Sequence, residues 1–571
     1  MLFIQHSQGR EVAASKIRYI QQMKPHTHNI NTVTSTVVIN GYDLSLNLLD
    51  KLSRGKENLR PVLSESALQA VAASRSMLER LLDEGAEIYG VTSGFGENCE
   101  TTVAPQAAVE LQHKLVIYHG VGCGAPLSLE ETRAVLITRL NTLARGYSGV
   151  RPTLLKHMLS LLELDVLPVI PEIGSVGASG DLTPLSYLAA LIGGDREAWW
   201  QGSRVPALEA LSEAGIEPLE LREKEGLAIM NGTAVMTGIA ALAVQSLGRC
   251  LGLAERLAAG AVEVSGGDRR AFDPDAHSLK PHPGQQSSAA RMYRYLAVTD
   301  GSADSPIAGR GGVGEPSAPG HRVQDVYSLR CAPQLIGAAV DTLVETARVI
   351  TVELNSSNDN PLFDPVRNKV YNTGHFQGSH VALASDALRN AAAVVADLLD
   401  KQCLLLLDGA RSGLPPNLAA LQADGGVDGG VDGVSGKTNR STAPNHGLKA
   451  LGITVSALAA EIDSLSAPIA SRSRPTESMN QDVVSLGQLS ARRLREVARL
   501  FELLCAAAAI VVAQAASLRS SNLMDALHTP ALEELLVWVR QSVPELKDDR
   551  ALHNELQGLA GRVAEWPSII G

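Results

Sequence analysis

Five long apolar segments with helical spacing limit the folds open to this chain more than any other feature. They cover about 230–261, 335–354, 377–407, 447–464 and 485–518. Apolar residues make up 45% of the sequence and aromatic residues only 4%, a balance that suits Ala- and Leu-rich helices better than sheets. Long helices with small residues on their faces pack closely against one another. The sequence therefore predicts a mainly α fold, a long-helix bundle with a smaller mixed N-terminal part.

The rest of the chain is organised around this bundle. Changes of composition predict a flexible leader at 1–35, an N-terminal domain at 36–225, the central helical bundle at 226–525 and a C-terminal helical tail at 526–571. A segment rich in Gly, Pro and Ser at 301–320 breaks the helical pattern. A second break, at 423–447, repeats Gly-Gly-Val-Asp and is predicted to be a flexible loop of low complexity.

The N-terminal domain mixes extended segments with helices. Val37 to Tyr42 predicts a strand that enters a turn. From Leu44 onward the spacing predicts helix as far as about Gly85, and a loop punctuated by glycines follows. Further helices are expected at about 104–122, 129–145 and 153–163.

Composition and cysteine usage exclude several classes of protein. The net charge of −11 and the scattered basic residues argue against a nucleic-acid partner. Six cysteines without a CxxC pair predict free thiols in a reducing cytoplasm, with no disulfide framework and no metal site. The longest apolar run, Leu503 to Ala513, is too short to span a bilayer, and Met1 to Ile4 is no signal peptide. We therefore expect a cytoplasmic protein without a membrane or nucleic-acid partner.

The stretch Gly174–Leu182, Gly-Ser-Val-Gly-Ala-Ser-Gly-Asp-Leu, gives the strongest chemical signal. Its small residues let the backbone fold sharply, and a plain turn or helix cap is one interpretation. The order Ala-Ser-Gly permits another, because the Gly180 nitrogen can close a five-membered ring if it reaches the Ala178 carbonyl carbon. Loss of two waters, one of them from Ser179, would then leave a methylidene on an imidazolone. The product would be an electrophile made from the chain itself.

Other polar strings stand out against the apolar helices. They are Tyr89 in a Gly-rich loop, Asn231-Gly232-Thr233, Tyr327-Ser328-Leu329-Arg330, Asn355 to Pro361, Gly374 to Gly378 and Thr476 to Asp482. Each alone fits an ordinary turn or helix cap. Taken together with the Gly174–Leu182 stretch, they resemble the aromatic amino-acid ammonia-lyase and aminomutase family, from about Val37 to about Leu518.

This resemblance implies a fold, a cofactor and an assembly. The fold would be mostly α-helical, of the histidine/phenylalanine ammonia-lyase type. The cofactor would be 4-methylidene-imidazole-5-one (MIO), formed autocatalytically within the 36–225 domain, with no external cofactor and no metal. The assembly would be a homotetramer whose active sites combine loops from three subunits. Helix N-termini would converge on the MIO, where their partial positive charge raises its electrophilicity.

The resemblance also assigns roles to single residues. The MIO tripeptide matches Ala178, Ser179 and Gly180. The catalytic base matches Tyr89, and a second tyrosine at the cofactor matches Tyr327. Positions that bind substrate match Tyr118, His119, Leu182, Asn231, Gln324, Arg330, Asn360, Phe376, Lys449, Glu477 and Gln481. Arg330 matches the arginine that binds the substrate carboxylate, a task that suits a bidentate guanidinium. Lys449 needs a one-residue gap in the match, and His375 replaces an Asn that many members carry.

The implied chemistry places a demand on Tyr89. Elimination removes a weakly acidic proton from the carbon β to the carboxylate and expels an amine, which is a poor leaving group. The reference pKa of tyrosine is about 10. We therefore expect surrounding positive dipoles to lower the pKa of Tyr89 so that it can act as a base.

Three residues carry the substrate signal. Histidine ammonia-lyases typically have Glu, which would pair with an imidazole, at the position that matches Gln481. Phenylalanine lyases tend to have Phe where this chain has Tyr118. His119 matches a Leu of many phenylalanine enzymes and a His of some tyrosine- and histidine-acting members. A neutral His119 either accepts a hydrogen bond from a para-hydroxyl or bonds a backbone carbonyl and only walls the pocket.

These residues predict an ammonia-lyase that converts L-phenylalanine, L-tyrosine or both to trans-cinnamate or trans-4-coumarate. An aromatic 2,3-aminomutase that gives a β-amino acid is the alternative. A histidine ammonia-lyase is less favoured because of Gln481. A catalytically inactive structural member is least favoured, because the tripeptide and both loop tyrosines are intact.

Overall fold

The computed structural model describes residues 35–55, 58–297, 324–420, 445–522 and 529–570. The leader predicted at 1–35, except Ser35, lies outside the described residues, as does the whole of 301–320. The loop predicted at 423–447 lies outside them except for its last three residues.

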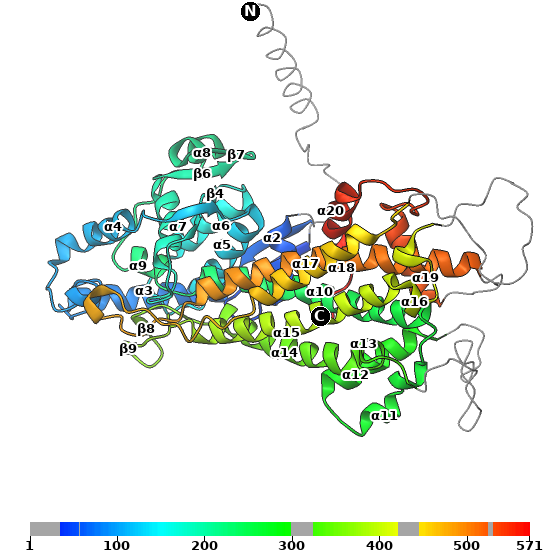
Figure 1. Ribbon diagram of the computed structural model, residues 1–571. Helices are drawn as coiled ribbons and strands as arrows, with labels where there is room; N and C mark the ends of the chain where they lie inside the picture. The colour runs from blue at the N-terminus through cyan, green and yellow to red at the C-terminus, as the bar shows by residue number, and fades with distance from the viewer. Residues whose placement is uncertain (1–34, 56–57, 298–323, 421–444, 523–528, 571) are drawn as a thin grey trace, which may run out of the picture.

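Five long helices form the body of the molecule and run alongside one another (Figure 1). They are α10 (Ala234–Val264), α14 (Ala332–Leu354), α15 (Ser379–Leu407), α17 (Lys449–Ser464) and α18 (Gly487–Asn522). Each coincides with a segment predicted from apolar spacing, and the mainly α fold class is confirmed. Shorter elements flank these helices: α11 (Pro274–Ser278), α12 (Pro283–Tyr295), α13 (Tyr327–Arg330), α16 (Gly409–Ser412), α19 (Pro530–Arg540) and α20 (His553–Gly561).

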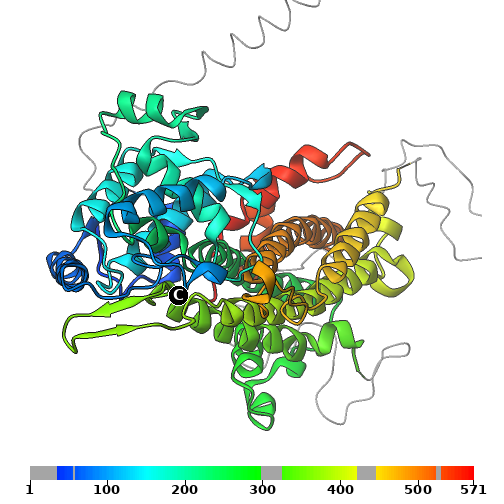
Figure 2. The same ribbon diagram turned by 90° about the vertical axis from the view of Figure 1, so that its left-hand side faces the viewer.

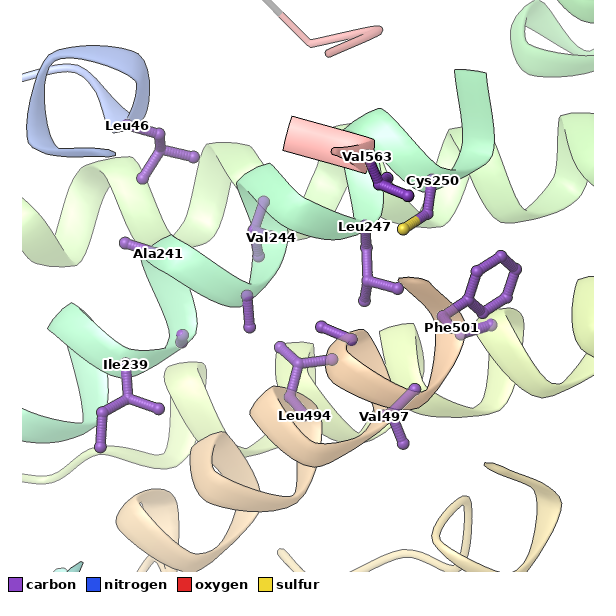
Figure 3. Packing of buried hydrophobic residues seen from close by; sticks show 14 of the residues in the cluster. Leu46, Ile239, Ala241, Val244, Leu247, Cys250, Leu494, Val497, Phe501 and Val563 are labelled. Atoms are coloured by element: carbon purple, nitrogen blue, oxygen red, sulfur yellow. The ribbon is translucent and has the colours of Figure 1, made fainter. Parts of the chain in front are cut away.

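Helix α10 lies at the centre of the core. It contacts α5 (Leu129–Leu143), α14, α15 and α18. Its side chains interdigitate with those of α18 around Leu247, Leu494 and Phe501 (Figure 3). By length and composition α10 and α18 could each cross a membrane. However, 94% of the most apolar segment of α10 and 83% of that of α18 are buried inside the protein. The apolar character of both helices is thus used in the packing of the core.

The N-terminal part lies against one end of the bundle (Figure 1) and, viewed from that end, to one side of α18 (Figure 2). Its helices are α2 (Leu46–Arg54), α3 (Glu65–Asp83), α4 (Ala108–Tyr118), α5 (Leu129–Leu143), α6 (Pro152–Glu163), α7 (Leu182–Gly193), α8 (Ala207–Ala214) and α9 (Glu225–Met230). Its strands are β1 (Ser35–Ile39), β2 (Leu59–Leu63), β3 (Cys123–Pro126), β4 (Leu167–Pro168), β5 (Pro171–Ile173), β6 (Glu197–Trp200) and β7 (Ser203–Pro206). A hairpin of β8 (Leu362–Asp364) and β9 (Lys369–Tyr371) follows α14.

One local prediction was wrong. The helix expected from Leu44 to about Gly85 is interrupted by β2, which pairs in parallel with β1, so that Val37 lies opposite Pro61. A proline in a helix interior removes a hydrogen bond and clashes with the preceding turn, and α2 ends at Arg54 with Gly55 in the left-handed conformation (φ 62°). The apolar spacing alone did not show the strand, because β2 is fixed by pairing with a segment 24 residues earlier.

Candidate active site

A cavity of about 380 Å³ opens where the Gly174–Leu182 stretch meets the loops after β9 and before α18. Its volume is that of a typical small-molecule site. Ten of the residues predicted for the active site line it: Tyr89, Tyr118, Ala178, Ser179, Leu182, Asn231, Asn360, Phe376, Glu477 and Gln481. Six do not: His119, Gly180, Gln324, Tyr327, Arg330 and Lys449.

The Gly174–Leu182 stretch is held from two sides. On one side, Leu486 N donates to Val176 O (2.9 Å) and Ser485 Oγ donates to Gly177 O (3.0 Å), both from the segment just before α18. Within the stretch, Ser175 Oγ donates to the Gly180 carbonyl (3.2 Å). These bonds make a rigid bend, so its glycines allow close packing rather than motion.

On the other side, the turn Asn231-Gly232-Thr233, which precedes α10, presses against the tripeptide. Asn231 Nδ2 donates to Ser179 O (2.8 Å), and Asp181 N donates to Gly232 O (2.8 Å). A Cβ on Gly180, whose φ is 73°, would lie only 2.2 Å from Gly232 O, so a side chain at 180 would collide with backbone. Asn231 is itself fixed, because its Oδ1 accepts from Asn360 N (2.8 Å).

Helix N-termini gather around the tripeptide. Helix α7 begins at Leu182, directly after it, and α10 begins directly after the turn that holds it. Helices α15 and α18 begin beside them, since a Cβ at Gly378 or Gly487 would lie 2.2 or 2.4 Å from Met236 Sδ of α10. Their partial positive charges favour negative charge at this point. The fixed bend, the small residues and the N–H donor at Ser179 O therefore fit a tripeptide that cyclises to MIO.

Tyr89 faces the cavity from the Gly-rich loop after α3. Its hydroxyl accepts a hydrogen bond from Gly96 N (3.0 Å), which would stabilise the phenolate. Burial nevertheless raises the pKa of Tyr89 above its usual value, and the charges of Glu477 and Cys99 raise it further. The expected lowering of the Tyr89 pKa is therefore not found within a single chain, because burial, with the negative charges of Glu477 and Cys99, outweighs the Gly96 N–H.

Glu477 lies on a strained segment beside Tyr89. Glu477, Ser478 and Met479 all have positive φ, at 48°, 51° and 71°. Each such residue costs about 1–3 kcal/mol, and strain of this kind clusters at functional sites. The Glu477 carboxylate packs against Gly96, where a Cβ would lie 2.1 Å from its Oε2. The segment thus holds a carboxylate next to the phenol.

The three residues that carry the substrate signal, Gln481, Tyr118 and His119, make different contacts. Gln481 Nε2 donates to Ser179 Oγ (3.0 Å), while its Oε1 accepts from Thr476 Oγ1 (2.6 Å). Tyr118 lines the cavity, and burial raises its pKa to about 12. His119 bonds the Leu115 carbonyl through Nδ1 (2.9 Å) and stacks on Tyr118 with 4.3 Å between ring centroids. His119 therefore lies behind Tyr118, with its Nδ1 used by the backbone.

The predicted residues on α13 and α17 lie away from this cavity. Figure 1 places α13 toward the other end of the bundle from α4 and α9. Tyr327 is 70% exposed, and the Arg330 guanidinium stacks over its ring at 4.7 Å. Gln324 is exposed just before α13, and Lys449 begins α17. One chain therefore does not bring these four residues to the tripeptide.

The structure adds residues that the sequence did not single out as site residues. Phe95, Leu115 and Leu227 give the cavity an apolar wall, and Asn480 and Asp482 lie at its rim beside Gln481. Phe95 belongs to the loop punctuated by glycines. The neighbouring Gly96 is the sequence feature that could have marked Phe95 as a site residue. His375 lies outside the cavity and bonds Thr373 Oγ1 through Nδ1. Among the described residues, no group of three His, Cys, Asp or Glu side chains could hold a metal ion.

Comparison with known proteins gives consistent results. A sequence model described as aromatic amino acid lyase matches residues 44–541. A histidine ammonia-lyase of Gloeobacter violaceus is 37% identical over 534 residues, 93% of this chain and 96% of the relative. A tyrosine ammonia-lyase of Cupriavidus metallidurans is 35% identical over 544 residues, 94% and 96% of the two chains. The crystal structure of tyrosine aminomutase from Streptomyces globisporus superposes with a TM-score of 0.82 at 31% identity, covering 93% of this chain and 97% of that one.

Proposed function

This chain belongs to the aromatic amino acid lyase family and is a carbon–nitrogen lyase, and from that premise we propose that it eliminates ammonia from L-phenylalanine, L-tyrosine or both. The products would be trans-cinnamate and trans-4-coumarate. Gln481 carries this proposal. A neutral amide stands at the tripeptide and offers no carboxylate to an imidazole. Before the ring closes, its Nε2 donates to Ser179 Oγ and its Oε1 accepts from Thr476 Oγ1. The wall of Phe95, Leu115 and Leu227 supports it, because an apolar surface suits a benzene or phenol ring.

The proposed mechanism assigns a role to each group at the cavity. The MIO formed from the Ala178–Ser179–Gly180 peptide would supply an electrophilic carbon that turns the substrate amine into a better leaving group. Asn231 holds the Ser179 carbonyl in place through its 2.8 Å hydrogen bond. Tyr89, as the phenolate, takes the proton from the β carbon and becomes the neutral phenol, and Gly96 N stabilises the phenolate charge before the transfer. Leu182 and Phe376 help to exclude water from the reacting carbons.

We further propose that the active site is completed by other copies of the chain, in a homotetramer. This places Tyr327, Arg330, Gln324 and Lys449 of neighbouring copies at the cavity that their own chain does not reach. Arg330 would then bind the substrate carboxylate bidentately and bring the positive charge that lowers the pKa of Tyr89. Arg330→Ala should raise KM for the amino acid, and sedimentation of that variant shows whether the assembly is intact. A normal KM would remove Arg330 from the site.

Separate incubations with phenylalanine, tyrosine and histidine test the proposed substrate. We expect arylacrylate absorbance to rise with phenylalanine, tyrosine or both, and no urocanate from histidine. A histidine ammonia-lyase is the second candidate, favoured by the relative in Gloeobacter violaceus. An aminomutase is the third, favoured by the likeness to the Streptomyces globisporus enzyme. Urocanate formation would establish the second, and a β-amino acid seen by NMR the third.

His119→Leu is expected to shift preference toward phenylalanine. The bond from Nδ1 to the Leu115 carbonyl leaves only Nε2 of the neutral ring to accept from a substrate para-hydroxyl. Burial and the charge of Arg196 lower the pKa of His119 and favour that neutral ring. A neutral hydrogen bond is worth about 0.5–1.5 kcal/mol, so the Tyr/Phe ratio of kcat/KM should fall roughly 2- to 13-fold. An unchanged ratio would leave His119 as a residue that only packs behind Tyr118.

Glu477→Gln is expected to move the alkaline rise of kcat/KM to lower pH. A base acts when deprotonated, so activity rises as pH passes upward through the pKa of Tyr89. The Glu477 carboxylate raises that pKa, and removing its charge lowers it. Tyr118, whose pKa is about 12, stays protonated over this range. Cys99 is present in both proteins, so its effect on the pKa of Tyr89 is the same in each. A pH profile of both proteins checks the shift, and a rise at the same pH would contradict it.

The cytoplasm remains the proposed location. All six cysteines are free, three of them buried in the core, as expected for a reducing compartment.

A further inference from the structure

Arg139 of α5 is fully buried directly behind the active site, yet it does not line the cavity. Its Nη2 donates to Asn231 O (2.7 Å) and to Ala228 O. Its Nη1 donates to Asn358 Oδ1 (2.7 Å) and Thr142 Oγ1 (3.3 Å). Burial lowers the pKa of Arg139 to about 10, with Asp359 and Asp181 opposing the shift, so it is charged at neutral pH.

A charge placed this way is costly for a core. Its hydrogen-bond partners are carbonyl, amide and hydroxyl oxygens rather than a carboxylate, and its Nε has no partner among the described residues. Burying a cation without a direct counter-ion opposes folding. Packing alone therefore does not account for Arg139. Two of its partners lead to one turn, because Asn231 belongs to the 231–233 turn and Asn358 bonds Thr233 of that turn.

Arg139 ties down both ends of the Asn231–Gly232–Thr233 turn. It holds Asn231 directly, through the backbone carbonyl. It holds Thr233 through Asn358, whose Nδ2 donates to Thr233 Oγ1 (2.7 Å) while Thr233 Oγ1 donates to the Glu353 carboxyl. The turn can therefore not move without breaking bonds to the guanidinium or to Asn358.

Arg139 packs against Gly232, and Gly232 packs against Gly180, with no side chain between them. A Cβ on Gly232 would lie 2.4 Å from Arg139 Nη1 and 2.6 Å from Asn358 Oδ1. A Cβ on Gly180 would lie 2.2 Å from Gly232 O and 2.6 Å from Gly232 N. Any shift of the guanidinium is thus transmitted through one glycine to the nitrogen side of Gly180.

We propose that Arg139 is a positioning residue whose guanidinium braces the 231–233 turn against Gly180 and holds the tripeptide in the bend from which its ring closes. The inference rests on the proposed MIO. In closure the Gly180 nitrogen bonds to the Ala178 carbonyl carbon and gives its proton to that oxygen, which leaves as water with the Ser179 amide proton. Ser179 Oγ then leaves as a second water with the α proton. Both steps are dehydrations and need no oxidant.

Arg139→Lys tests the brace, because lysine keeps a charge but loses the fork that reaches two partners at once. Arg389→Lys is the matched control. Arg389 is also buried and also bonds backbone carbonyls, those of Leu465 and Ala467, but it does not touch the tripeptide or the 231–233 turn. The full-length variants are made by cell-free synthesis, and mass spectrometry of the peptide containing 174–182 follows the loss of two waters with time. Thermal unfolding reports stability separately.

We expect Arg139→Lys to slow the loss of water about 10- to 100-fold, since small misplacements of reacting atoms cost rates of this order. Arg389→Lys should lower Tm but cyclise at the normal rate. A normal rate in folded Arg139→Lys, or an equal slowing in Arg389→Lys, would overturn the proposal. If Arg139→Lys fails to fold, Asn358→Ala decides in the same way. A native chain that loses no water would instead refute the proposed MIO itself.

Discussion

Ser179→Ala is expected to leave a folded protein whose kcat is lower by roughly 10³-fold or more, because it removes the only hydroxyl from which the methylidene can form. The fold should persist, since among the described residues Ser179 Oγ takes part in one hydrogen bond, the 3.0 Å bond from Gln481 Nε2. The carbonyl of residue 179 would still accept from Asn231. Loss of activity with the fold retained is therefore the signature of a chemical role.

Three measurements on the same sample check this. Arylacrylate formation gives kcat, thermal unfolding gives stability, and the mass of the 174–182 peptide shows whether both waters have been lost. Ser160→Ala is the matched control, because Ser160 lies on α6, outside the cavity, and among the described residues its hydroxyl bonds its own helix at Lys156 O. Lyase activity within a few fold of the native enzyme in Ser179→Ala would contradict the proposed cofactor and the mechanism built on it.

The bundle was predictable because its signal is local. Helices α10, α15 and α18 follow from apolar spacing within each segment, and their observed bounds differ from prediction by a few residues. Strand β2 was not predictable in the same way, because Leu59–Leu63 becomes a strand only by pairing with Ser35–Ile39. Local spacing says nothing about such a partner.

The residues of the candidate site likewise fall into those with a local sequence signal and those without one. The Gly174–Leu182 stretch and the turn at Asn231 carry their signal in consecutive residues, and the structure brings them into contact. Arg139 gave no signal, because a single arginine in an apolar helix looks like any other. Its meaning comes from Asn231 and Asn358, which lie 92 and 219 positions away. Long-range polar contacts of this kind were visible only in three dimensions.

The surroundings of Tyr89 in a single chain do not lower its pKa as the proposed mechanism requires. The chemistry requires a lower pKa, yet burial and Glu477 raise it. Arg330, the cation assigned to the substrate carboxylate, lies on α13 away from the cavity of its own chain. The two observations agree if other copies deliver Arg330 to Tyr89, which is why the proposed mechanism depends on the proposed assembly.

Tyr89→Phe is expected to lower kcat by roughly 10²–10⁴-fold, the contribution of a positioned general base. Phenylalanine keeps the ring that packs against the core and loses only the hydroxyl that accepts from Gly96 N. Stability should therefore change by about 1 kcal/mol, the worth of one hydrogen bond. Loss of water from the tripeptide should be complete, since among the described residues the Tyr89 hydroxyl bonds Gly96 and makes no hydrogen bond to Gly180 or to the 231–233 turn.

The pH profile separates a base from a residue that only shapes the cavity. Residual activity in Tyr89→Phe should no longer rise as pH increases through the tyrosine pKa, whereas a packing defect would lower kcat at every pH and keep the rise. Tyr42→Phe is the control, because Tyr42 is 53% exposed and lies outside the cavity. Near-normal turnover in Tyr89→Phe, or a retained alkaline rise, would remove Tyr89 from proton transfer. The base would then have to be sought among the groups that other copies would bring to the cavity in the proposed homotetramer, of which Tyr327 carries the same phenol.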